Sequence, residues 1–75
     1  MLPDEEWRRF VAWIPSQGFA ESTARTYAER ARFAMLRGAS TSADVDRVMP
    51  NHPRRSRCFA RCGLDLLQKF LEVPA

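Results

Sequence analysis

The chain has 75 residues, of which 12 are Lys or Arg and 9 are Asp or Glu, giving a formal net charge of +3. A chain this short forms one small domain (1–75) that buries only about 60% of its unfolded surface. All the basic residues except Lys69 are arginine, whose planar fork of donors suits phosphate as well as ordinary ion pairs. The composition therefore permits an anionic partner without requiring one.

Three further classes are disfavoured by simple patterns. Cys58 and Cys62 lie four residues apart in a helical pattern, so they do not make a disulfide framework. The N-terminus does not resemble a signal peptide, and the longest apolar run is far shorter than a membrane span. We expect a reducing cytoplasmic setting and no membrane partner.

The first predicted helix covers about residues 4–14. Acidic residues at its start suit the helix dipole. Its apolar residues have the i, i+3, i+4, i+7 spacing of one buried face: Trp7, Phe10, Val11 and Ile14. Pro15 and Gly18 are expected to end it.

The second predicted helix covers about residues 21–37, with Gly38 as its stop. Its buried arc is rich in small residues, which suit the close approach of another helix: Ala24, Tyr27, Ala28, Ala31, Ala34 and Met35. Arginines flank the arc, Arg25 and Arg32 on one side and Arg30 and Arg37 on the other.

A short third helix is predicted over residues 42–49, with several possible N-caps in "STSAD". The fourth, about residues 55–73, is apolar over more than half its circumference, which is typical of a central helix. Its apolar residues are Phe59, Cys62, Leu64, Leu66, Leu67, Phe70, Leu71 and Val73. No strand pattern occurs, so the predicted fold is all-α, a small four-helix bundle with short loops.

Metal binding and catalysis find little support. His52, Cys58 and Cys62 are three potential ligands, but a structural zinc site needs four. We interpret the cysteines as small buried thiols on a core helix. A Cys–His nucleophile needs an orienting third group and a pocket. We therefore expect no catalytic residue, no metal, no cofactor and no enzymatic activity of this chain alone.

Residues 50–64, "PNHPRRSRCFARCGL", contain four arginines and no acid. Arg54 and Arg55 lie at the helix start, where free backbone N–H groups also favour phosphate. Arg57 and Arg61 share the face opposite the core. Two interpretations stay open: a surface that positions a nucleic-acid backbone, or a solvated helix start whose arginines pair with acids on neighbouring helices.

Residues 18–36, "GFAESTARTYAERARFAML", resemble the second helix of the N-terminal core-binding (SAM-like) domain of tyrosine recombinases, the phage-integrase family. Gly18, Phe19, Thr23 and Tyr27 occupy the places of that family's pattern. "EEWRRFVAWI", "TSADVDRVM" and "RRSRCFARCGLDLLQKFLEV" are similar to its first, third and fourth helices. The resemblance thus extends along the whole chain.

Three features depart from the family. Ala20 replaces the usual capping Ser, so the N-cap of the second helix must come from another residue or be weak. Phe33 comes one place earlier than the usual aromatic residue. The recombinase catalytic domain, with its nucleophilic Tyr, is absent from this chain, and Tyr27 is expected in the core.

The resemblance implies a non-catalytic DNA-binding module that positions a site-specific tyrosine recombinase or integrase on its DNA half-site during recombination. The implied partner is double-stranded DNA, contacted mainly through its backbone, with a recombinase catalytic domain or other protomers as further partners. The implied setting is a bacterial or phage-encoded protein of a mobile element, associated with the nucleoid. The DNA-facing residues carried over are Ser22, Thr23, Arg25, Arg32, Arg54, Arg55, Arg57 and Arg61.

A second hypothesis belongs to another class: a stand-alone helical protein–protein interaction protein of a phage or mobile element. Phe33 and Leu36 lie outside the buried arc of the second helix. Together with the Trp13 side of the first helix, they would supply hydrophobic anchors for a partner.

Overall fold

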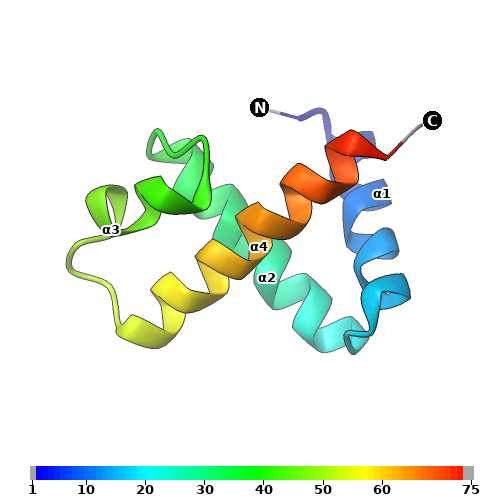
Figure 1. The fold of residues 1–75 in the computed structure, drawn as a ribbon, viewed down its shortest axis with the longest axis horizontal. Helices are drawn as coiled ribbons and strands as arrows, with labels where there is room; N and C mark the ends of the chain where they lie inside the picture. Colours follow the sequence, from blue (N-terminus) through cyan, green and yellow to red (C-terminus); the bar gives the residue numbers. More distant parts are fainter. Residues whose placement is uncertain (1, 74–75) are drawn as a thin grey trace.

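The computed structural model describes residues 2–73, and over them the chain contains four α-helices, two short 3-10 segments and no strand (Figure 1). The predicted all-α bundle is confirmed. Met1, Pro74 and Ala75 of the predicted domain lie outside the described residues. The segments are α1 (Asp4–Trp13), η1 (Ile14–Gln17), α2 (Glu21–Leu36), η2 (Ser42–Asp44), α3 (Val45–Val48) and α4 (Arg54–Glu72). None of these helices has the combination of length and apolar character that crossing a membrane would require.

The two longest helices, α2 and α4, cross at the centre of the molecule, with α1 on one side and α3 on the other (Figure 1). Gly63 lies at the crossing. A Cβ added to it would overlap the Tyr27 carbonyl oxygen and come within 2.9 Å of the Ala31 Cβ. Ala31 and Ala60 are fully buried at this interface. The arc of small residues predicted on α2 therefore receives α4 at close range.

Aromatic side chains attach α1 to the far end of α4. The Phe10 ring is fully buried, and its centroid lies 5.5 Å from those of Trp7 and Phe70. Trp13 packs on Phe70 at the same distance. Aromatic pairs at this separation contribute about 0.5–1.5 kcal/mol beyond their buried area. The predicted face of α1 is thus the side that closes the core.

The connection after α1 agrees with the prediction for the α-helix, which ends at Trp13, before Pro15. Pro15 lies in the first turn of the 3-10 segment η1 that follows, and a proline cannot donate the backbone hydrogen bond that would continue an α-helix. The reversal comes at Gly18, whose φ of 98° is a left-handed conformation. Ala20 is the N-cap of α2 and makes no side-chain capping bond, which confirms the weak cap.

The third predicted helix begins as expected at Ser42, but its first turn is the 3-10 segment η2 and only Val45–Val48 is α-helical. Thr41 is the N-cap and forms a capping box with Asp44, so one of the N-caps expected in "STSAD" is used. Val45 and Met49 are buried beneath α4 and fix this short segment to the core.

The apolar surface of α4 is narrower than the sequence pattern suggested. Leu71 and Val73 are 58% and 50% exposed, because nothing in the described chain packs on that side of the last turn. The interpretation of both cysteines as buried thiols is wrong for Cys58, which is exposed, and only partly right for Cys62, which is half-buried. The buried apolar residues of α4 are Ala60, Leu64, Leu66 and Leu67.

We predict that Gly63→Ala destabilises the protein although alanine is the better helix former. The new methyl group must displace the Tyr27 backbone or separate α2 from α4, and overpacking of this kind costs about 1–3 kcal/mol. Urea unfolding followed by circular dichroism measures the change. Gln68→Ala, at an exposed position of the same helix, should stay within about 0.5 kcal/mol of the wild type. A Gly63→Ala variant as stable as the wild type would contradict the close crossing.

Candidate nucleic-acid interface

The first turn of α4 is an open and positively charged helix end. Its N-cap is Pro53, which makes no side-chain capping bond, and the first turn contains no acidic residue. Arg54 and Arg55 are both exposed there. The unpaired N–H groups of the first turn and the helix dipole favour an anion at this end.

Helix α2 contributes one arginine beside this helix start, and a second arginine follows at its C-terminal end. Arg30 lines a small hollow together with Phe33, His52 and Ser56. The Phe33 ring meets the His52 ring edge-on at 5.1 Å, and the Arg37 guanidinium lies 4.6 Å from the centre of the same ring. The aromatic pair thus connects the end of α2 to the loop that leads into α4.

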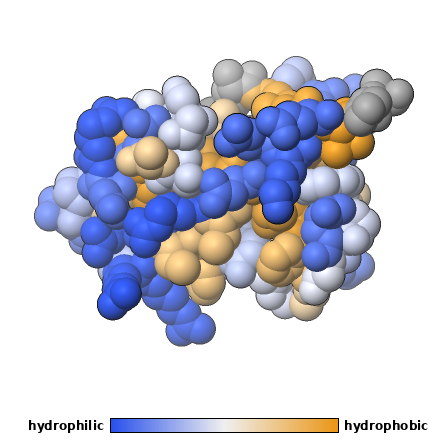
Figure 2. Space-filling view, in the orientation of Figure 1, coloured by the Kyte–Doolittle hydropathy of each residue, from blue (hydrophilic) through white to orange (hydrophobic). Residues whose placement is uncertain are grey.

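We name these residues the α4-start surface: Arg30, Arg37, His52, Arg54 and Arg55. Within residues 2–73, none of its four arginines forms an ion pair. The Arg55 guanidinium lies 5.6 Å from the centre of the Phe59 ring, a cation–π contact that leaves its donors available. In Figure 2, strongly hydrophilic side chains project from the lower left, where α4 begins.

Arg30 and Arg37 were not among the predicted site residues. The sequence placed them on the flank of α2 opposite Arg25 and Arg32, and both flanks carried two arginines. Only the direction in which α4 crosses α2 decides which flank lies beside Arg54 and Arg55. No local sequence signal specifies that direction.

Arg57 and Arg61 are engaged within the protein. The Nη1 atoms of both donate to Oδ1 of Asp46 in α3, at 3.4 Å from Arg57 and 2.7 Å from Arg61. Their side chains are 29% and 37% exposed, and the buried Nε of Arg57 has no acceptor among residues 2–73. Pairing with an acid on a neighbouring helix, one of the two interpretations left open, therefore describes these two arginines but not Arg54 and Arg55.

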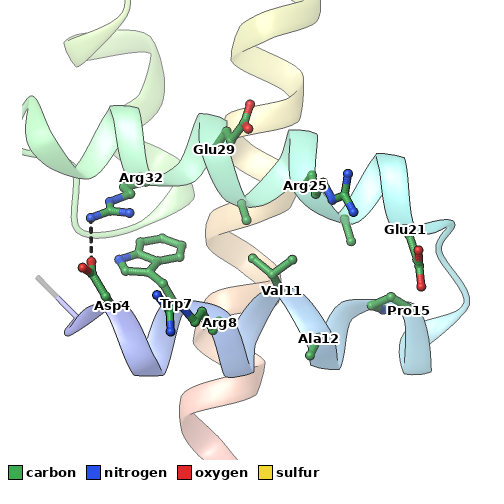
Figure 3. A pocket seen from close by; sticks show the side chains of 12 residues that line it. Asp4, Trp7, Arg8, Val11, Ala12, Pro15, Glu21, Arg25, Glu29 and Arg32 are labelled. Atoms are coloured by element: carbon green, nitrogen blue, oxygen red, sulfur yellow. Dashed lines mark hydrogen bonds and ion pairs between the residues drawn. The ribbon is translucent and has the colours of Figure 1, made fainter.

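The residues of α2 that were predicted to face DNA lie away from the α4-start surface. Arg25 and Arg32 line a groove whose walls are α1, η1 and α2, with α4 behind it (Figure 3). Arg32 also donates to Asp4 at 3.2 Å. Ser22 is exposed and Thr23 half-buried in the first turn of α2, outside the hollow beside Ser56. The structure therefore does not bring Arg25 and Arg32 together with the arginines of α4.

The carboxylate of Asp44 stabilises the start of the η2–α3 segment, which contains Asp46. Asp44 Oδ2 accepts hydrogen bonds from the backbone N–H groups of Ser40 and Thr41, at 2.8 and 3.2 Å. These bonds, the Ser40 bond most of all, hold the pKa of the Asp44 carboxyl below its ordinary value, and Arg47 adds to the effect. The cap thus positions α3, whose Asp46 binds Arg57 and Arg61.

The two thiols lie one helical turn apart on α4, close to Tyr27. Burial raises the pKa of the Cys62 thiol, and the neighbouring Cys58 raises it further. Burial likewise raises the pKa of the Tyr27 hydroxyl. In the described part of the chain, no three His, Cys, Asp or Glu side chains are placed to share a metal ion.

Comparison with known proteins adds no relative: no family model, no curated protein and no solved structure matches the chain. Kinship with the tyrosine recombinases therefore remains a prediction that depends on four similar segments occurring in the same order and at similar lengths.

We predict that Asp44→Asn lowers stability at neutral pH and that its difference from the wild type disappears in acid. Because the folded-state pKa of Asp44 is depressed, its contribution is present above the unfolded pKa and is lost as the pH falls through the folded one. Thermal unfolding between about pH 2 and pH 7 tests this. A constant difference between the two proteins over that range would show that the carboxylate charge does not matter.

Proposed function

We propose that this chain is a non-catalytic module that binds double-stranded DNA through the α4-start surface. One observation carries the proposal: Arg54 and Arg55 lie at an uncapped helix start that has no acid in its first turn. Arg30 lines the adjoining hollow and Arg37 packs on its Phe33 wall, and none of the four forms an ion pair in residues 2–73. Each arginine can donate to a phosphate, and the first-turn N–H groups add a further anion site.

The arrangement of this surface suits contacts with the DNA phosphate backbone better than contacts with base edges in a groove. Its side chains come from the start of α4, one flank of α2 and the loop that leads into α4, so no single helix presents the whole set to a groove. With about four phosphates neutralised, the logarithm of the binding constant should fall against the logarithm of salt concentration with a slope of roughly −3.6. We expect modest sequence specificity and strong salt dependence.

The finer proposal follows from the sequence resemblance. A small helical module that binds duplex backbone would suit the positioning half of a tyrosine recombinase, in which another domain carries the catalysis. The Arg54 and Arg55 positions support it, since both lie in the matched fourth-helix segment and are exposed. Arg25 and Arg32 support it less, because they lie on another face.

We predict that Arg54→Glu/Arg55→Glu weakens binding to duplex DNA about tenfold or more at roughly 50 mM salt, because phosphate contacts become repulsive. Fluorescence anisotropy with a labelled duplex measures the affinity. The matched control is Arg9→Glu/Lys69→Glu, which changes the net charge equally at two exposed positions outside both the α4-start surface and the groove between α1 and α2. An equal loss in both variants would mean that net charge alone drives binding. Wild-type protein that does not bind DNA at low salt would refute the proposed function.

Removing the carboxylate shared by Arg57 and Arg61 should have the opposite effect. We predict that Asp46→Asn binds DNA a few-fold more tightly and with a steeper salt slope, because two arginines near the helix start are released. Its stability should fall by no more than about 1 kcal/mol, as is usual for exposed ion pairs. Asp65→Asn makes the same charge change at an exposed residue of α4 that forms no ion pair in residues 2–73. Equal affinities of the two variants would place Arg57 and Arg61 outside the interface.

A further inference from the structure

The groove between α1 and α2 lies on the other side of α2 from the start of α4, and its volume is about 790 Å³ (Figure 3). Its floor is apolar, with Trp7, Val11, Ala24 and Ala28 facing into it. The buried indole nitrogen of Trp7 has no acceptor among the described residues. The small residues of the floor would allow the close approach of another helix.

Charged residues of alternating sign follow the α2 rim of this groove. Glu21, Arg25, Glu29 and Arg32 all line it and all are exposed. Their spacing of four, four and three residues keeps them on one edge of the helix. Within residues 2–73 only Arg32 of this row forms an ion pair, with Asp4 across the groove, and the other three charged side chains form none.

An alternating row of this kind is complementary to itself when a second copy runs antiparallel. Glu21 then faces Arg32 of the second copy, and Arg25 faces Glu29 of the second copy. The two-fold axis repeats both pairs, so four ion pairs form. The Glu21–Arg32 pair and the Arg25–Glu29 pair require slightly different alignments of the two helices. The two alignments differ by one residue, about 1.5 Å along the helix, and these long side chains can span that difference. A parallel arrangement would instead place like charges together.

From this charge pattern we infer that the groove is the interface of a symmetric dimer. In this dimer the α1–α2 face of one chain packs on the same face of another, with the two α2 helices antiparallel and in contact. A two-fold interface uses the same patch on both copies, and the row on α2 meets that requirement. Since α4 lies behind α2 as seen from the groove (Figure 3), the dimer would leave both α4-start surfaces uncovered. The inference does not depend on the proposed DNA binding.

The test is a charge swap at the central pair, followed by sedimentation velocity without DNA at roughly 50 mM salt. The wild type should sediment as a dimer, at twice the 8.6 kDa of one chain. Glu29→Arg and Arg25→Glu should each be monomers, because each places like charges opposite one another. An equal mixture of the two variants should form a heterodimer, since the arginines of one then face the carboxylates of the other.

Two control variants make the same charge changes outside the groove. Glu72→Arg and Lys69→Glu, both exposed on α4, should remain dimers, and circular dichroism should show that all four variants are folded. A monomeric wild type would overturn the proposal. So would swap variants that stay dimeric, or a mixture that stays monomeric, because either result means that α2 does not pair with itself in this register. DNA binding by the wild type would not be affected by any of these outcomes.

Discussion

The close crossing of α2 and α4 at Gly63 is the contact on which the other arrangements depend. The missing side chain at that residue lets the backbone of α4 lie against Tyr27 and Ala31 of α2. Around it, Phe59 packs on Tyr27 with ring centroids 5.6 Å apart, and Tyr27 packs on Phe19. A larger residue at position 63 would separate the helices, and the alanines of α2 would then have no surface to bury against.

The crossing also divides the surface of the molecule into two chemically different faces. On one side of α2, the start of α4 lies beside Arg30. On the other side, α1 packs along α2 and leaves the groove that Arg25 and Arg32 line. Arginines five residues apart on one helix, Arg25 and Arg30, therefore face different surroundings. Net charge alone does not reveal this division.

Much of the helical organisation could be predicted from the sequence, because strong local signals mark it. Apolar periodicity and the flanking glycines and prolines placed the ends of α1, α2 and α4 within one residue of those observed, whereas α3 begins at Val45, three residues later than predicted, because the 3-10 segment η2 precedes it. The first helix ends before Pro15 as predicted, but the 3-10 segment between that helix and Gly18 was not predicted. Leu71 was predicted in the apolar face, yet periodicity cannot show whether another element covers the last turn of α4.

The candidate site could be predicted only in part, for a physical reason that Arg57 and Arg61 illustrate. Their spacing showed that they share a face of the fourth helix, but their partner Asp46 lies on a different helix. Whether an arginine is engaged or available depends on such contacts between elements. Arg54 and Arg55 were identified correctly as exposed because a helix start with no acid nearby is a local feature.

The α4-start surface and the groove between α1 and α2 differ in how many carboxylates lie beside their arginines, and this difference favours a different partner for each. A polyanion is attracted by a surface where arginines stand without carboxylates, and the α4-start surface meets that condition within the described residues. Along the groove, Glu21 and Glu29 alternate with Arg25 and Arg32, so the attraction of a phosphate to each arginine is opposed by a neighbouring carboxylate. Such a row gains most from a partner with its own alternation, and a second copy of α2 in the antiparallel direction has that pattern.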